Sequence, residues 1–221
     1  MADWSTIASL ATAGGTLVLA VATFSSVRSS QATARIAERS LLVGLRPALV
    51  PSRRTDPPEK VRFGDGVYVK VEGGRAALEH RGDVFYLVLP LRNLGSGTAV
   101  LQAWWVGRSQ DFDPARSTEM LLSPLSEFRP QSIDLYIAGG DTGFWQGAIR
   151  RPDDPFRPVA DEAAGERGRV YVDLLYGDEE HLQRTVTRFM ISRSDQHAAD
   201  VDGDVWLANV IRHWRIDDHT A

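Results

Sequence analysis

Residues 169–191, RVYVDLLYGDEEHLQRTVTRFMI, decide the fold class of this chain. In 170–175 one set of side chains (Val, Val, Leu) alternates with another (Tyr, Asp, Leu), which is the two-residue period of a β-strand. The polar turn GDEE follows at 177–180, and a second β-rich run ends at 191. The segment therefore predicts a β-hairpin with strands at 169–176 and 181–191.

The remainder of the chain from residue 47 onward has the same character. Short β-rich runs are separated by Gly, Pro, Asp and Asn clusters, as in antiparallel sandwiches and barrels. Further strands are expected at 47–50, 67–71, 84–92, 99–107, 132–137 and 143–149. The predicted fold over 47–221 is a mainly β, antiparallel β-sandwich, immunoglobulin-like or related.

Three segments of this β-rich region are less regular. The spacing of Trp206, Val210 and Trp214 suits both a helix and a strand over 205–216, and we favour the strand. The polar segments 150–168 and 192–204 are expected to be loops, because of their prolines and their charge.

Residues 4–27 contain no charged side chain. As a helix this run is about 36 Å long, enough to cross a hydrocarbon core of about 30 Å. The sequence predicts a transmembrane helix with a short flank over 1–28, a juxtamembrane helix over 29–46 that Pro47 ends, and the β-domain over 47–221. The anchor side chains are expected to be Trp4, Leu17, Val18, Leu19, Val21 and Phe24.

Two other interpretations of residues 4–27 compete with a retained span. Ala20-Val21-Ala22 resembles a signal-peptide cleavage site, but the first four residues, MADW, lack a basic region. A buried helix of a soluble protein would normally show a polar stripe, whereas the only polar side chains in this run are small hydroxyls. Small residues at four-residue spacing, such as Ala8, Thr12 and Thr16, suit helix self-association, although an alanine-rich composition explains them equally well.

Basic residues follow the apolar run and set its expected orientation. Arg28, Arg35, Arg39 and Arg46 lie on its C-terminal side, with Glu38 as the only acid among them. Basic residues next to a span tend to stay in the cytoplasm. We expect the N-terminus outside, the β-domain in the cytoplasm of a bacterial inner membrane, and Arg28, Arg35 and Arg39 at the lipid headgroups.

Composition excludes several functional classes. The 221 residues are 43% hydrophobic and 24% charged and include no cysteine, which excludes disulfides, thiolate metal sites and cysteine nucleophiles. From Pro47 onward 21 basic residues face 27 acidic ones, a net charge of about −6. An acidic domain is a poor ligand for a polyanion, so no nucleic-acid partner is expected. The strong preference for arginine over lysine is typical of a GC-rich bacterial genome.

Two loop motifs suggest ligand chemistry. Gly95-Ser96-Gly97 follows a strong strand, but the third glycine and the helix of a dinucleotide fingerprint are missing, so the glycines indicate a bulge or turn. The acidic segment 195–204 offers Asp195, Asp200, Asp202 and Asp204 as weak calcium ligands. Its glycine and closing residue do not follow the EF-hand pattern, and a solvated acidic turn is the favoured interpretation.

No residue pattern carries a catalytic signature. The histidines lack a metal-binding spacing, and no Gly-x-Ser-x-Gly elbow is present. We expect no catalytic residue, no cofactor and no enzymatic activity. The aromatic pairs Trp104-Trp105 and Phe144-Trp145 are of more interest, because neighbouring strand residues face opposite sides and one ring of each pair should leave the core. These four residues are candidate partner contacts, unless a loop covers the outward ring.

Several loose motifs resemble a family. They are Arg46-Pro47, Asn93 to Ala99, Tyr171 with Asp173, Arg184 to Phe189, and Arg212 to Asp217. With the preceding span, they make the chain similar to bacterial single-pass, membrane-anchored β-sandwich proteins that have no assigned activity. The resemblance implies architecture only.

The leading functional hypothesis is a membrane-tethered, non-enzymatic interaction or scaffold module that binds a protein partner or itself. The alternative is an envelope-facing sensor or ligand-binding domain, which would use the 195–204 loop for calcium. Calcium-dependent melting would distinguish the two.

Overall fold

The computed structural model describes residues 3–108, 122–165, 168–180, 183–194 and 204–216. For residues 4–7, 11 and 39 it describes the backbone alone. The chain divides into two units, Met1–Gly44 and Leu45–Ala221, each of which is described by itself.

The first unit is a single helix, α1, over Trp4–Leu45. Its segment Ala8–Leu45 contains an 18-residue stretch with a mean hydropathy of 1.6 and is long and apolar enough to cross a membrane. The hydroxyls of Thr12 and Thr16 donate to the carbonyl oxygens of Ala8 and Thr12, at 3.0 and 2.9 Å. These polar side chains are therefore satisfied within the helix, which lowers their cost in an apolar environment. The expected continuation of the helix through residues 29–45 is confirmed.

The second unit is mainly β, as expected, and all of its paired strands are antiparallel. The strands are β1 (Leu49–Pro51), β2 (Glu59–Arg62), β3 (Tyr68–Val71), β4 (Ala77–Arg81), β5 (Val84–Asn93), β6 (Ala99–Gly107), β7 (Arg129–Pro130), β8 (Tyr136–Ile137), β9 (Thr142–Ile149), β10 (Arg169–Gly177), β11 (Arg184–Arg193) and β12 (Trp206–Arg215). A 3₁₀ turn covers Leu125–Glu127, and helix α2 covers Arg157–Ala164.

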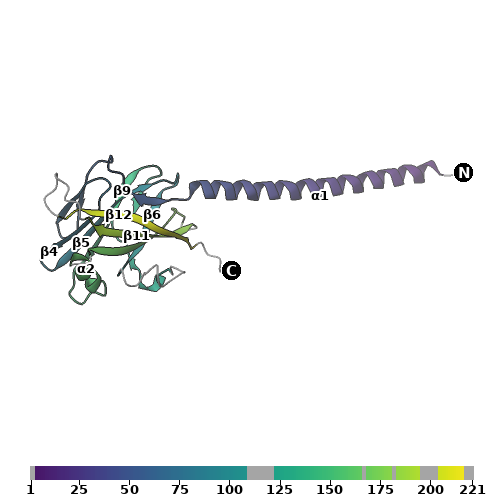
Figure 1. Cartoon of the computed structure of the whole chain (residues 1–221). Coiled ribbons are helices and arrows are strands. Elements are labelled where there is room, and N and C mark those ends of the chain that lie inside the picture. Colours follow the sequence, from purple (N-terminus) through teal and green to yellow (C-terminus); the bar gives the residue numbers. More distant parts are fainter. Residues whose placement is uncertain (1–2, 109–121, 166–167, 181–182, 195–203, 217–221) are drawn as a thin grey trace. The chain divides into compact units, whose positions relative to one another are not determined.

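The strands form a four-stranded, a six-stranded and a two-stranded sheet (Figure 1). In the four-stranded sheet β9 pairs along most of one edge of β5, so β1 and β4 share the other edge. The six-stranded sheet runs β12-β11-β10-β6, with β7 and β8 both paired to β6. The two-stranded sheet is the hairpin β2-β3. Strand β12 is thus an edge of the six-stranded sheet.

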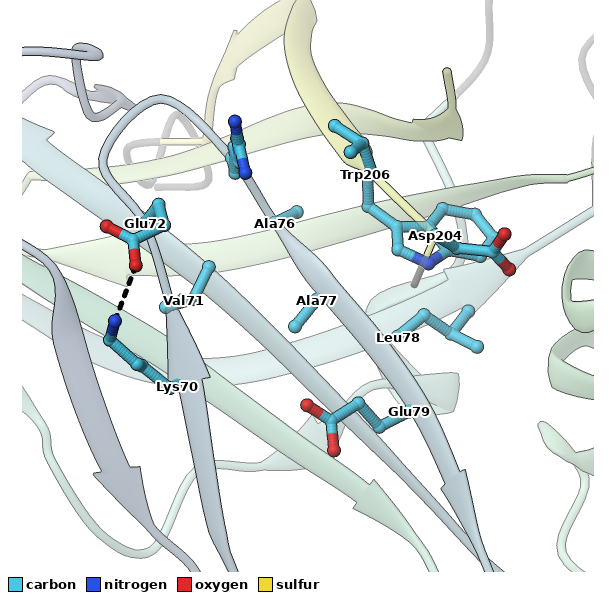
Figure 2. A pocket seen from close by; sticks show the side chains of 11 residues that line it. Lys70, Val71, Glu72, Ala76, Ala77, Leu78, Glu79, Asp204 and Trp206 are labelled. Atoms are coloured by element: carbon cyan, nitrogen blue, oxygen red, sulfur yellow. Dashed lines mark ion pairs between the residues drawn. The ribbon is translucent and has the colours of Figure 1, made fainter. Parts of the chain in front are cut away.

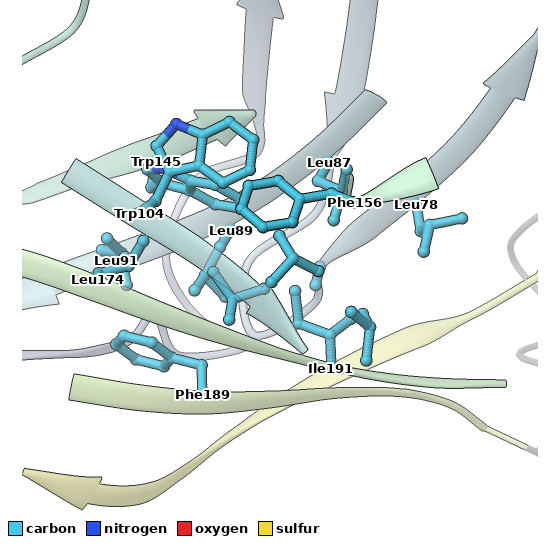
Figure 3. Packing of buried hydrophobic residues seen from close by; sticks show 14 of the residues in the cluster. Leu78, Leu87, Leu89, Leu91, Trp104, Trp145, Phe156, Leu174, Phe189 and Ile191 are labelled. Carbon is cyan, nitrogen blue, oxygen red and sulfur yellow. The ribbon is translucent and has the colours of Figure 1, made fainter. Parts of the chain in front are cut away.

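One hydrophobic cluster, the main core, contains side chains from both larger sheets. Leu87 and Leu89 of β5 and Leu174 of β10 are fully buried in it (Figure 3). Trp104 and Trp145 meet edge to face, with ring centroids 5.4 Å apart. Since a fully buried Leu contributes about 1.5–3 kcal/mol relative to an exposed one, this cluster is a principal source of stability.

A second cluster lies where the β2-β3 hairpin packs against β4, β5 and β9. It includes Val61 and Phe63 from the β2 region, Val69 of β3, and Tyr86 and Val88 of β5. Because neighbouring residues of β5 face opposite sides, Val88 belongs to this cluster while Leu87 and Leu89 belong to the main core.

Several sequence-based assignments are confirmed. The hairpin at 169–191 forms β10 and β11, with Asp173 paired to Arg188. Segment 205–216 is a strand, and those expected at 84–92, 99–107 and 143–149 are present to within one residue at each end.

Other assignments were wrong. The expected loop at 150–168 contains α2, which places Val159, Ala160 and Ala163 in the main core. Pro158 lies in its first turn, where the missing N–H costs no helical bond. The expected strand at 132–137 is reduced to Tyr136–Ile137. Strands β2 and β4 were missed because short, charged sequences such as EKVR show little alternation of apolar residues.

Candidate functional site

The expected anchor side chains are exposed on α1. Leu17, Val18, Leu19, Val21 and Phe24 are between 63% and 70% exposed. Arg28 and Arg35, which were expected at the headgroups, are exposed as well, whereas the side chains of Trp4 and Arg39 lie outside the described part. Large apolar side chains this exposed need a solvent other than water or a partner.

The two aromatic pairs have one buried and one half-buried member each. Trp104 and Trp145 are 3% and 1% exposed. Trp105 packs edge to face against Phe156, with ring centroids 6.5 Å apart, and Phe144 packs on the second cluster. One ring of each pair does leave the fully buried core, but part of it is covered by neighbouring residues. As partner contacts these four residues remain a prediction.

The candidate calcium loop is described only at its end. Asp195, Asp200 and Asp202 lie outside the described residues. Asp204 is described, and its carboxylate accepts a hydrogen bond from Arg193 at 3.2 Å. Within the described ranges no group of three or more acidic or histidine side chains could hold a metal ion. The calcium hypothesis therefore stays a prediction.

The glycines of Gly95-Ser96-Gly97 allow another part of the backbone, residues 45–47, to approach this loop closely. A Cβ at Gly97 would lie 1.9 Å from the carbonyl oxygen of Leu45, and one at Gly95 would lie 2.2 Å from that of Arg46. The chain that leaves α1 thus runs directly over this loop. Asn93 holds the same junction, because its side chain accepts from the backbone N–H of Ala48 at 3.1 Å and donates to the carbonyl of Gly97 at 2.7 Å.

A cleft of about 330 Å³ lies where the two larger sheets meet (Figure 2). The backbone N–H of Ala76 donates to the carbonyl oxygen of Trp206 at 2.9 Å, which joins the start of β4 to the start of β12. The cleft is lined by Lys70, Val71, Glu72, Arg75, Ala76, Ala77, Leu78, Glu79, Asp204, Val205 and Trp206. It is therefore built from β3, β4, β12 and the turns that precede them.

Most charges of the cleft are already paired. Lys70 lies 2.7 Å from Glu72 (Figure 2), and Asp204 pairs with Arg193. Glu79 forms an ion pair with Arg81. Arg75 is half-buried and has no ion-pair partner among the described residues. A half-buried guanidinium with no carboxylate beside it in the described part of the chain favours an anionic group on a ligand, for which it offers two parallel donors.

A second small cleft, of about 140 Å³, lies between the 129–133 segment and β9. Gln146 lines it and is 4% exposed, and its side-chain amide donates to Asp134 while the Oε1 atom has no partner. Arg129 there donates two hydrogen bonds to Asp154 and lies 4.8 Å from the centre of the Trp104 ring. A cleft of this size suits a few ordered waters on Gln146 rather than a ligand.

The cleft at the start of β12 could not have been located from the sequence. Its walls depend on β4, whose short sequence ALEHR gives little periodicity, and on a single backbone bridge between Ala76 and Trp206. The signals available were the apolar-polar run at the start of β12 and the turn residues Gly73 and Gly74 before β4.

No family model, no curated protein and no solved structure matches this chain.

Proposed function

We propose that the chain is a single-pass, membrane-tethered interaction module without enzymatic activity, in which the second unit is an antiparallel β-sandwich, immunoglobulin-like or related. The observation that carries the proposal is α1, a 42-residue helix with an apolar segment, joined to a separate β unit. Water is a poor solvent for side chains such as Leu17 and Phe24, and lipid is a good one.

The sandwich is supported by the shared main core. Leu89 and Trp145 come from the four-stranded sheet, and Leu174 and Phe189 come from the six-stranded sheet, yet all four belong to one cluster. Two antiparallel sheets that bury their inner faces against each other form a sandwich.

The proposed location is a bacterial inner membrane, and the proposed orientation places the β unit on its cytoplasmic side. Arg28, Arg35, Arg39 and Arg46 follow the apolar run, with Glu38 as the one acidic residue between them. This is the charge bias of a cytoplasmic flank. A protein partner or a second copy of the chain then meets the β unit close to the membrane.

An interaction role, rather than catalysis, is supported by the cleft at the start of β12. Its carboxylates at Glu72, Glu79 and Asp204 each pair with a cation, so none is set up as a free general base. Its remaining features are a half-buried guanidinium and the edge of a sheet, which serve binding.

The test is fractionation of cells that express the full chain with a C-terminal reporter. We expect the chain to stay in membranes after extraction with alkaline carbonate, and a reporter active only in the cytoplasm to be active. Chemical crosslinking in those membranes should give a discrete larger species. Recovery of the intact chain in the soluble fraction would refute the tether, and activity of a periplasm-specific reporter would refute the orientation.

A further inference from the structure

The outer edge of β12 carries unpaired backbone groups. The carbonyl of Val205 accepts from Ser194 at 2.7 Å, on the side of β11, whereas the carbonyl of Trp206 accepts from Ala76 at 2.9 Å, on the outer side. Successive residues of a strand point their backbone groups to opposite sides. The N–H and C=O groups of Ala208 and Val210 therefore point outward. Beyond Ala76 no described strand forms a hydrogen-bonded ladder with this edge, although β1 lies close to β12.

Ala76 shows that the edge accepts an antiparallel strand. It pairs with Trp206 in the antiparallel sense, but from Ala77 onward β4 pairs with β5 of the four-stranded sheet. In this antiparallel sense the residues before Ala76 face the next residues of β12, and they form a turn in which the N–H of Arg75 donates to the carbonyl oxygen of Glu72 at 3.2 Å, so no ladder continues along the edge. β12 is ten residues long and has a register shift at Ile211, so its regular part, which ends at Val210, is the stretch to which another polypeptide can add.

The charge of this edge identifies the chemistry of the added strand. Strand β12 holds two arginines and no acidic residue, in a domain whose net charge from Pro47 onward is about −6. Arg212, His213 and Arg215 of β12 are exposed. Opposite charges across neighbouring strands stabilise pairing and like charges oppose it. The edge therefore favours an acidic segment over a basic one.

The cleft at the start of β12 lies where the end of such a segment would bind. A strand antiparallel to β12 runs from the Arg215 end toward the Trp206 end, so its C-terminus arrives beside Ala76. Arg75, the residue before Ala76, lines the cleft there and has no ion pair among the described residues. A terminal carboxylate is an acceptor that matches its guanidinium.

We infer that β12 binds the acidic C-terminal tail of a partner protein as an added antiparallel strand, with the tail's terminal carboxylate on Arg75. The inference rests on the proposed interaction function and names the partner's chemistry. The backbone of β12 supplies the affinity, Arg212 and Arg215 select acidic side chains, and Arg75 fixes the register.

The first test varies the ligand and leaves the protein unchanged. The full chain in phosphatidylcholine nanodiscs is titrated into a ten-residue peptide of alternating Glu and Val, labelled at its N-terminus and free at its C-terminus, and fluorescence anisotropy is measured. We expect a Lys-Val peptide or a C-terminally amidated Glu-Val peptide to bind about tenfold more weakly. Two N-methylated peptides, methylated at odd or at even positions, should differ, because only one set of N–H groups faces β12.

The second test varies the protein. Ala208→Pro removes an outward N–H, which an edge strand tolerates, and Arg75→Gln removes the carboxylate ligand; each should weaken binding about tenfold. The matched control is Arg62→Gln, an exposed arginine of β2 outside the cleft. If Ala208→Pro fails to fold, the N-methylated pair still decides the matter.

Several results would overturn the inference. They are equal binding of the Lys-Val and Glu-Val peptides, equal binding of the two N-methylated peptides, and equal effects of Arg75→Gln and Arg62→Gln. The inference is also overturned if the edge is occupied by a second copy, seen as peptide binding only after dilution, or by residues 217–221, seen as peptide binding only after their truncation. Any of these leaves the membrane tether intact, since fractionation tests the tether separately.

Discussion

Asp173 lies directly opposite Arg188 on β10 and β11, and neither side chain has any exposed surface. The Nε and Nη2 atoms of Arg188 each donate to a carboxylate oxygen of Asp173 at 2.6 Å, and Ser123 contacts both partners at 3.2 and 3.1 Å. The ring of Trp214 lies 4.8 Å from the guanidinium carbon. Burial raises the pKa of Asp173, while the bonds from Arg188 and Ser123 act in the opposite direction. The Asp173 carboxylate stays ionised because its partner, Arg188, is held in a fixed position beside it.

Arg188→Met should destabilise the β unit by about 3–5 kcal/mol, because it leaves the Asp173 carboxylate buried without a counter-ion. The double variant Asp173→Leu/Arg188→Met should recover most of this loss, since two apolar side chains of similar volume replace the pair. Urea unfolding of the full chain in detergent, followed by tryptophan fluorescence, measures both. A double variant as unstable as the single one would contradict the electrostatic explanation.

The hairpin that holds this pair was visible in the sequence, whereas its energetics were not. The alternation in 170–175 and the turn GDEE gave the strands, and the register that places Asp173 opposite Arg188 follows from them. Burial of both charges depends on Ser123 and Phe128, which reach the sheet from a distant segment. In the same way, α2 and β4 are stabilised by tertiary packing rather than by their own patterns, so the cleft that β4 lines had no local signal.

His213 should make the stability of the β unit depend on pH. Its Nδ1 lies 2.7 Å from the hydroxyl of Thr187, which lies 2.9 Å from that of Tyr176, and Tyr176 accepts from the backbone N–H of Leu49 at 3.1 Å. A chain in which Tyr176 and then Thr187 donate ends on an unprotonated Nδ1. Burial lowers the pKa of His213 below its ordinary value of 6.5. The unfolded chain therefore takes up the proton first as pH falls.

This stabilisation is fully present above pH 6.5 and is lost as the pH falls below 6.5 toward the folded-state pKa. His213→Gln should flatten that part of the curve when urea midpoints are compared at pH 7.5 and pH 5.5. His80→Gln, on β4 and outside this hydrogen-bonded chain, is the control and should keep the wild-type slope. Identical slopes for the wild type and His213→Gln would exclude His213 as the group responsible.

Gly97→Ala should destabilise the junction between α1 and β1. The new methyl group would lie 1.9 Å from the carbonyl oxygen of Leu45, which is backbone and cannot rotate away. Overpacking of this kind costs about 1–3 kcal/mol. Gly64→Ala is the matched control, because a Cβ there meets nothing within 4 Å. Equal urea midpoints for the two variants would show that residues 45–47 do not lie over the 95–97 loop.

Leu17→Arg should weaken the proposed membrane span. An arginine near the centre of a span costs about 2.5–3.5 kcal/mol on insertion scales. The apolar run is only moderately hydrophobic, because ten of its 24 residues are Ser, Thr or Gly, so this cost should shift much of the chain out of the carbonate-resistant fraction. Thr33→Arg adds the same charge beyond the apolar run, among Arg28 and Arg35, where headgroups and water solvate it. Retention of Thr33→Arg together with loss of Leu17→Arg assigns the anchoring to residues 4–27, and equal behaviour of the two variants would remove that assignment.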